Sequence, residues 1–180
     1  MKKKPDLRTI KKKLKEGQKL TQAETRKWRA KNKELAWQAF SKYIRTRDCI
    51  RLNGSLETVT CVTCNKSFPF KSLQAGHFVA GRNDAVLFNE EVVHAQCIVC
   101  NVMKGGMYAE YAVFMLKQGY TQEQIEDFIK LKQSPLKYDV DDFISIKNDY
   151  NSRTSTIIEQ FNQKDPLEID QNKLNAVFDV

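Results

Sequence analysis

The chain of 180 residues lacks the long apolar runs that mark membrane proteins, since none approaches the roughly 18 residues of a membrane-spanning helix. Its N-terminus is a lysine cluster without the apolar segment that follows such a cluster in a signal peptide. We therefore expect no membrane partner and a reducing cytoplasm as the setting. Histidine is also scarce, so chemistry that needs an imidazole has to use His77 or His94.

The five cysteines need an explanation other than disulfides, because a chain of this length can form a modest core as one domain without them. Four of them form two CxxC pairs, Cys61/Cys64 and Cys97/Cys100. Zinc takes four thiolate ligands in a tetrahedron, and each CxxC turn supplies two. The pattern predicts one structural zinc ion with no open coordination position. Cys49 has no partner pair and is expected to be a small buried apolar side chain.

Positive charge is concentrated near the N-terminus. Residues 1–47 hold 17 Lys/Arg against 4 Asp/Glu, whereas residues 48–120 hold 6 of each and residues 121–180 hold 7 against 12. Cations that neutralise phosphates release condensed counterions, so this distribution favours DNA binding by the N-terminal part. A solvated basic helix face is the alternative. The candidate DNA contacts on this helix are Arg26, Lys27, Arg29, Lys31 and Lys33.

Composition and periodicity predict a mostly helical α+β chain. Its segments are a basic flexible arm (1–20), a basic amphipathic helix (21–50), a zinc-bound core (51–120), a C-terminal helical region (121–164) and an acidic tail (165–180). Thr21 and Glu24 form the capping box that starts the first helix. A last helix is expected from about 140 to 163, in which 148–156 is poor in helix formers and is a candidate break.

The core is predicted as a hairpin carrying the first CxxC pair, a strand over about 73–79, a return strand over about 92–96 and a short helix that begins near Asn101. This order places the His77 imidazole and the Asn101 amide on adjacent elements. An imidazole with a pKa near ~6.5 can take a proton from water, and an amide oxygen can hold a hard divalent ion beside a phosphate. The pattern predicts phosphodiester hydrolysis; a packing role for the histidine is the alternative.

A longer string of residues resembles the NinG/Rap recombination proteins of lambda-type phages and, more broadly, the HNH or ββα-metal nuclease superfamily. The matching stretch lies within about residues 58–120 and consists of Cys61-x-x-Cys64, LQAGHF from Leu73, LFNEEVVHAQCIVCN from Leu87, Gly105 and Glu110-Tyr111. The resemblance implies a zinc-stapled ββα-metal core with flanking helices. It also implies an endonuclease, in the host cytoplasm if phage-encoded, that cuts branched DNA such as Holliday junctions or D-loops.

The resemblance assigns roles residue by residue. His77 corresponds to the general base, Asn101 to a ligand of a catalytic Mg²⁺ or Mn²⁺ ion, and Lys104 to a cation on the first turn of the metal helix. This chain departs from the family pattern at Gly76, where Asp or His is common as a second ligand, and at Val92, where Asn is usual. Candidates for the missing functions are water, Asp84, Glu90 and His94 for the second ligand, and Asn89 for the loop residue.

One alternative function and the oligomeric state stay open at this point. A non-catalytic, zinc-containing DNA-binding accessory protein of recombination would account for both departures. Resolution of a four-way junction requires two cuts, which a two-fold symmetric homodimer makes naturally, and the flanking amphipathic helices are candidates for such an interface.

Overall fold

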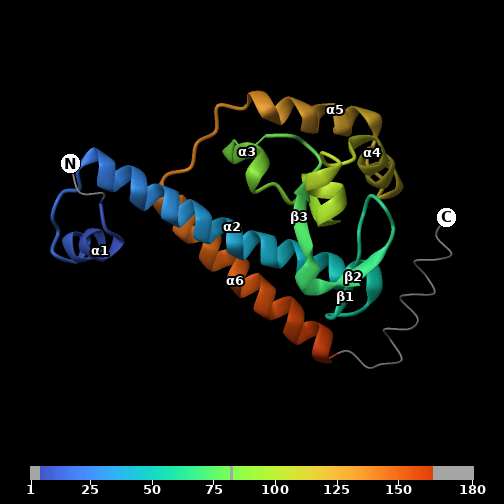
Figure 1. The fold of residues 1–180 in the computed structure, drawn as a ribbon, viewed down its shortest axis with the longest axis horizontal. Coiled ribbons are helices and arrows are strands. Elements are labelled where there is room, and N and C mark those ends of the chain that lie inside the picture. Colours follow the sequence, from blue (N-terminus) through green and yellow to red (C-terminus); the bar gives the residue numbers. More distant parts are fainter. Residues whose placement is uncertain (1–4, 82, 164–180) are drawn as a thin grey trace.

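The computed structural model describes residues 5–81 and 83–163 (Figure 1). The long helix α2 (Gln22–Asn53) runs along one side of the core, and the last helix α6 (Val140–Gln163) packs along it. The chain is α+β and mostly helical, as predicted, with two small two-stranded sheets. Among the described residues, no helix combines the length and apolar character needed to cross a membrane.

Helix α2 begins where the capping box predicts. The Thr21 hydroxyl accepts a hydrogen bond from the Glu24 amide (3.3 Å), and the Glu24 carboxylate accepts one from the Thr21 amide (2.9 Å). The helix runs three residues beyond the predicted end at residue 50, and Gly54 stops it in the left-handed conformation with φ 54°. Its apolar stripe, which includes the fully buried Phe40 and Ile44, faces the main core.

The basic N-terminal segment differs from the expected flexible arm. Leu7–Lys15 form helix α1, which Asp6 caps by accepting a hydrogen bond from a backbone amide. Ile10 is completely buried, and Lys13 pairs with Glu24 at 2.8 Å. One apolar side chain and one ion pair thus order a segment that composition assigned to a mobile tail. The predicted acidic tail lies outside the described residues.

Two antiparallel hairpins form the β structure. Strand β1 (Thr58–Thr60) pairs with β2 (Ser67–Pro69), and β3 (Leu73–His77) pairs with β4 (Val93–Cys97). Their positions agree with the predicted strands to within two residues. In the second hairpin Gln74 lies opposite Gln96 and Gly76 opposite His94, so these four side-chain positions share one face. Each CxxC pair begins at or directly after a strand end.

The helices after β4 differ in part from the predicted ones. The expected helix at Asn101 is a π-helical turn (Val99–Met103), and Lys104 is its C-cap rather than a first-turn residue. Helices α4 (Tyr108–Lys117) and α5 (Gln122–Lys130) follow, and the short α3 (Asp84–Leu87) lies between the strands of the second hairpin in sequence. Helix α6 is continuous through the candidate break at 148–156.

The short helices complete the connections: η1 (Phe70–Ser72), η2 (Glu90–Val92) and η4 (Leu131–Gln133). Tyr150 shows why α6 does not break, because this side chain is buried and packs edge-on against Phe40 of α2, with ring centroids 4.9 Å apart. Contacts with α2 therefore offset the weak helix propensity of this stretch.

The apolar core consists of two clusters. The larger one joins α2, α6, α4 and the second hairpin, and the smaller one surrounds the cysteines. Cys49 belongs to the smaller cluster, is completely buried and donates from Sγ to the Thr58 carbonyl oxygen. Burial raises the pKa of this thiol to about 11. The predicted role of Cys49 as a small buried side chain is confirmed.

Candidate metal centre and the residues around His77

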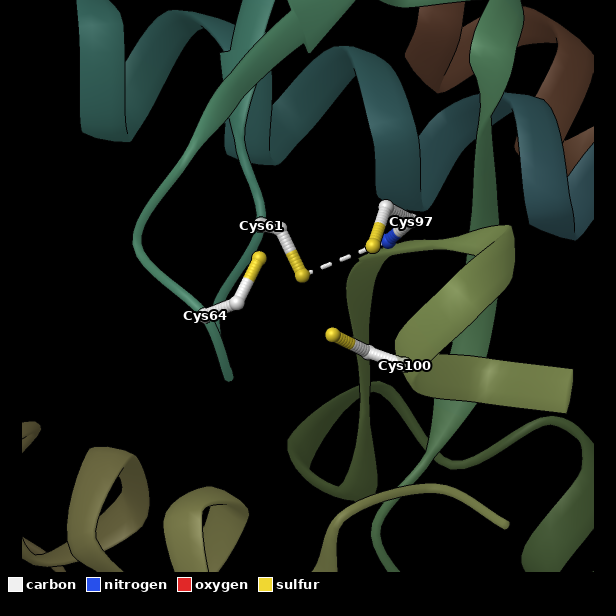
Figure 2. A group of neighbouring side chains, drawn as sticks. All are labelled: Cys61, Cys64, Cys97 and Cys100. Carbon is white, nitrogen blue, oxygen red and sulfur yellow. Dashed lines mark hydrogen bonds between the residues drawn. The ribbon is translucent and has the colours of Figure 1, made fainter. Parts of the chain in front are cut away.

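The four cysteines of the CxxC pairs meet at one point (Figure 2). Their sulfur atoms all lie within 4.8 Å of one another. One pair lies in the turn between β1 and β2, and the other lies at the end of β4 and in the π-helical turn. Four thiolates are the ligand set of a structural zinc site, so the residues fit the predicted ion. The four cysteines are placed to hold zinc and to connect the two hairpins.

The surroundings of Cys61 favour a thiolate. Burial would raise the pKa of this group, but hydrogen bonds from the Thr63 hydroxyl (3.3 Å) and the Cys97 amide (3.3 Å) lower it to about 7. Burial raises the pKa of Cys100, in contrast, to about 12. A metal ion deprotonates its thiol ligands, so zinc binding at neutral pH releases protons from this cluster.

The second CxxC pair positions Asn101. This residue follows Cys100 within the π-helical turn, and its side chain is half-buried. Its Nδ2 atom donates to Oε1 of Gln74 at 2.7 Å. That hydrogen bond connects the turn to strand β3 and fixes the direction of the Asn101 amide oxygen.

His77 lies at the end of β3, where its ring contacts Trp37 and the Leu87 carbonyl oxygen. The ring stacks on Trp37 of α2 with centroids 5.2 Å apart and planes inclined by 18°. Its Nε2 atom lies 3.4 Å from the Leu87 carbonyl oxygen. A carbonyl can only accept, so this contact favours the tautomer with the proton on Nε2. In that tautomer Nδ1 carries the lone pair that a general base needs.

Gly76 precedes His77 on β3, and its side-chain position faces Gln96 and Asn101. A Cβ atom at this position would lie 1.9 Å from Oε1 of Gln96, nearer than real Cβ atoms approach other atoms, and 3.0 Å from Oδ1 of Asn101. The Gly76 carbonyl accepts a hydrogen bond from the buried Tyr111 hydroxyl at 3.0 Å. A side chain at this departure from the family pattern would therefore have to displace the Gln96 amide.

A family model described as NinG, bacteriophage lambda NinG protein, matches residues 1–159. The chain belongs to the NinG family. Protein ninG of Escherichia phage lambda is 26% identical over 119 residues, which cover 66% of this chain and 53% of that relative. The chain thus spans about half the length of this relative. No solved structure was found to match it.

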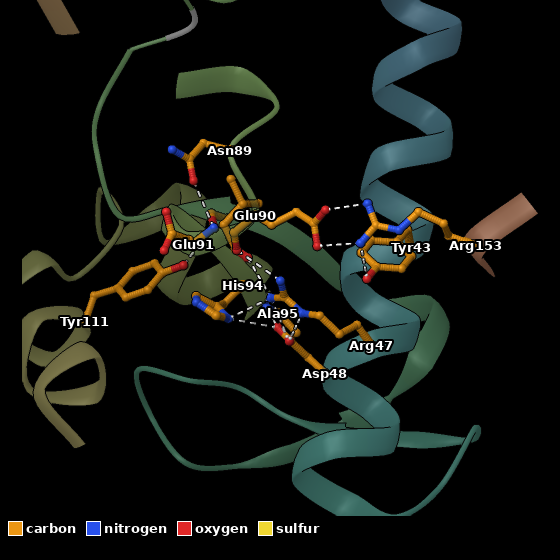
Figure 3. A network of polar contacts seen from close by, with 12 residues as sticks. Tyr43, Arg47, Asp48, Asn89, Glu90, Glu91, His94, Ala95, Tyr111 and Arg153 are labelled. Carbon is orange, nitrogen blue, oxygen red and sulfur yellow. Dashed lines mark hydrogen bonds and ion pairs between the residues drawn. The ribbon is translucent and has the colours of Figure 1, made fainter. Parts of the chain in front are cut away.

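In this NinG-family chain, His94 belongs to a buried polar network (Figure 3). Arg47 of α2 donates to its Nδ1 atom (2.9 Å), and the Asp48 carboxylate lies 3.3 Å from the same atom. The two contacts make opposite demands on Nδ1, because Arg47 has only donors and needs a lone pair there, whereas the Asp48 carboxylate has only acceptors and needs a proton there. Burial lowers the pKa of His94, and its Nε2 atom is buried without a hydrogen-bond partner among the described residues.

Asp48 is the centre of that network. It is completely buried, accepts from the Ala95 amide (2.7 Å) and accepts from Nε of Arg47 (2.9 Å). Burial would raise the pKa of Asp48, but His94 and Arg47 hold it below its usual value. Arg47 also donates to the Glu90 and Val93 carbonyl oxygens. The network therefore attaches strand β4 to helix α2.

The other candidates for a second metal ligand have their own partners. Asp84 is buried and pairs with Lys33 (2.5 Å) and Arg29 (3.2 Å), and it accepts from the Tyr138 amide. Glu90 pairs with Arg153 at 2.5 Å and accepts from Tyr150, as Figure 3 shows for the ion pair.

Asn89, the candidate for the loop residue, caps the short helix η2 by accepting from the Glu91 amide at 2.9 Å. Phe78 donates from its amide to the Val92 carbonyl oxygen at 2.7 Å, so backbone atoms close the loop between the strands. Val92 itself is completely buried in the main core.

The candidate DNA-binding residues fall into two groups. Arg29 and Lys33 pair with Asp84 and hold α2 to the core, and Lys31 pairs with Glu34 at 3.0 Å. The others are exposed: Arg26, Lys27, which donates to the Pro5 carbonyl oxygen, and Lys104 at the end of the π-helical turn.

Sequence reasoning missed three residues near His77: Trp37 as its stacking partner, Gln74 as the partner of Asn101, and Gln96 as the side chain that fills the space beside Gly76. The only feature of the sequence that points to the two glutamines is the alternation of side chains along a strand. Positions 74 and 76 share a face with the residues opposite them on the return strand, among them Gln96.

Proposed function

We propose that this protein is a metal-dependent endonuclease of phage recombination that hydrolyses phosphodiester bonds in branched DNA. The observation that carries the proposal is that strand β3 places the oriented imidazole of His77 directly after Gly76, the residue beside which the Asn101 amide oxygen lies. The family membership supports a role in phage recombination. The order β3, β4 and a turn that carries Asn101 supports assignment to the ββα-metal superfamily.

In the proposed reaction, His77 accepts a proton from the attacking water at Nδ1. Trp37 and the Leu87 carbonyl oxygen hold the ring so that this nitrogen keeps its lone pair. Asn101 Oδ1 contributes to binding Mg²⁺ or Mn²⁺. When bound, such an ion polarises the phosphate and stabilises the leaving oxygen. The cysteine cluster takes no part in the chemistry and holds Asn101 in place.

The exposed cations supply the DNA contacts in this proposal. Lys104 lies three residues after Asn101 and is exposed, so it can meet a phosphate next to the cleaved bond. Arg26 and Lys27 lie near the start of α2, and helix α1 adds the exposed Lys12 and Lys15 in its last turn. Phosphate contacts position a nucleic acid without reading its sequence, which suits a substrate recognised by its branched shape.

The test is cleavage of matched linear and branched DNA by the zinc-loaded protein, with and without Mg²⁺ or Mn²⁺. His77→Ala should lower the cleavage rate by about 10²–10⁴-fold with DNA binding retained, since that is the usual contribution of a general base. Asn101→Ala should remove the metal-dependent activity. Asn151→Ala, an exposed site on α6, is the matched control and should cleave normally.

A non-catalytic DNA-binding accessory protein is the competing function, favoured by Gly76 and Val92 at positions where the family pattern carries Asp or His and Asn. It predicts that wild-type protein binds branched DNA and cuts neither substrate with either ion. That result would reject the endonuclease. Analytical ultracentrifugation of the DNA complex would separately test the proposed homodimer, which two symmetric cuts require.

A further inference from the structure

Gln96 has a buried oxygen without a hydrogen-bond partner. The residue is completely buried on β4, and its Nε2 atom donates to the Gly106 carbonyl oxygen (2.9 Å) and to the Thr63 hydroxyl (3.3 Å). Its Oε1 atom is buried and accepts no hydrogen bond among the described residues. Flipping the amide would turn the oxygen toward the Gly106 carbonyl, where two acceptors would repel, so the direction of Oε1 is fixed.

The unpartnered oxygen points at the same place as Asn101 Oδ1. Both atoms lie next to the position that a Cβ on Gly76 would occupy, so they are at most about 5 Å apart. Asn101 has its nitrogen tied to Gln74, just as Gln96 has its nitrogen tied to Gly106. Two amide oxygens with their nitrogens held away from each other converge on one point. Placing two acceptor oxygens this close costs free energy unless a donor or a cation lies between them.

We propose that Gln96 Oε1 is the second protein ligand, beside Asn101 Oδ1, of the divalent cation. This inference rests on the proposed function and names the ligand that Gly76 cannot supply. The Gln96 amide reaches across from β4 into the space that a side chain at position 76 would fill. Oxygen ligands about 2 Å from the ion are what Mg²⁺ and Mn²⁺ prefer, and two such oxygens lie up to roughly 4 Å apart. To bind one ion, the two oxygens must move closer together, and the half-buried Asn101 side chain can make this movement.

The position of the Gln96 amide explains why residue 76 is a glycine. A carboxylate at position 76 and the Gln96 amide would occupy the same volume, so a chain can use one or the other. Tyr111 holds the Gly76 carbonyl oxygen at 3.0 Å, which keeps strand β3 close to Gln96. Gln96 thus supplies from strand β4 the ligand that residue 76 of strand β3 does not.

The experiment is Mn²⁺ titration of the zinc-loaded full chain, followed by the EPR signal of free Mn²⁺, which reports binding without requiring cleavage. Gln96→Met keeps the length and removes the oxygen, and it should raise the Kd at least 10-fold. Gln96→Glu keeps an oxygen and adds a negative charge, and it should lower the Kd. Gln118→Met, at an exposed glutamine, is the matched control and should leave the Kd unchanged.

A measurement on the wild-type chain avoids variants that fail to fold. Adding Mg²⁺ should shift the side-chain amide NMR signals of Gln96 and Asn101 and leave those of Gln118 in place. Shifts at Asn101 without any at Gln96, or an unchanged Kd in both Gln96 variants, would overturn the inference while leaving the proposed metal site intact. Absence of any Mn²⁺ binding beyond the zinc site would overturn both.

Discussion

Replacing Asp48 by alanine should remove a large part of the stability of this protein. Asp48 is completely buried, and its carboxylate accepts from the Ala95 amide at 2.7 Å and from Arg47 at 2.9 Å. Its loss leaves the Arg47 guanidinium, only 19% exposed, without a counter-ion, and leaves the Ala95 amide without its acceptor. Removing one partner of a buried ion pair typically costs about 3–5 kcal/mol.

The magnitude is large in relation to the whole protein. Domains unfold with a free energy of only about 5–15 kcal/mol, so the variant should lose a substantial fraction of it. For a chain of this length each kcal/mol lowers Tm by roughly 2–4 °C, which predicts a fall of roughly 6–20 °C. The assay is urea denaturation of the zinc-saturated protein followed by circular dichroism, with thermal melting as a second readout.

Asp127→Ala is the matched control. The Asp127 side chain is 61% exposed and pairs with Lys130 one helical turn away at 2.7 Å. Exposed ion pairs of this kind contribute about 0–1 kcal/mol, so this variant should unfold almost as the wild type does. A loss below about 1 kcal/mol for Asp48→Ala would show that solvent already screens the network, and our description of its burial would be wrong.

Three further changes test other parts of the structure. Chelating zinc should unfold β1, β2 and the turn that carries Asn101, since structural zinc sites supply folding free energy. Hydrogen exchange should then show rapid exchange of the amides in these segments and continued protection of those in α2, and uniform protection would contradict this. Thr21→Ala should cost about 1 kcal/mol through the lost helix cap, measured by urea denaturation, and no change would mean that the start of α2 frays. Stability should fall on acidification, because the pKa of His94 is lower in the folded chain than its unfolded value near ~6.5 and that of Asp48 is also lowered. The urea midpoint should therefore drop below about pH 6.5 and further below about pH 4, with zinc content measured in parallel. A midpoint that stays flat over this range would refute the lowered pKa values of His94 and Asp48.

Elements with local signals were predicted accurately. The capping box at Thr21 placed the start of α2, because a hydroxyl and a side chain three residues later satisfy each other's backbone amides whatever surrounds them. The CxxC spacing likewise predicted that the four cysteines would meet, and the structure brings their sulfurs together.

Elements that depend on distant contacts were predicted poorly. Helix α1 is ordered by burial of Ile10 and by an ion pair with Glu24, neither of which leaves a trace in local composition. Helix α6 is continuous because Tyr150 packs against α2, although its sequence suggested a break. The turn at Asn101 is π-helical, a conformation for which sequence offers no pattern.

For the candidate site, the sequence by itself determined which residue types were available and roughly where they lie. It selected His77 and Asn101 from their spacing to the cysteines, and it marked Gly76 as the position where a ligand is missing. It also offered Asp84, Glu90 and His94 as substitutes, since nothing local shows whether an acidic or imidazole group has another partner.

The tertiary structure alone decided how those groups are used. It paired the three substitutes with arginines, lysines and Asp48, and it placed Trp37 against His77 from a helix forty residues away in sequence. It also brought the Gln96 oxygen to Gly76, because antiparallel pairing sets side chains from opposite strands on one face. Register and packing are properties of the whole fold, and a hydrogen-bond partner is known only when the fold is known.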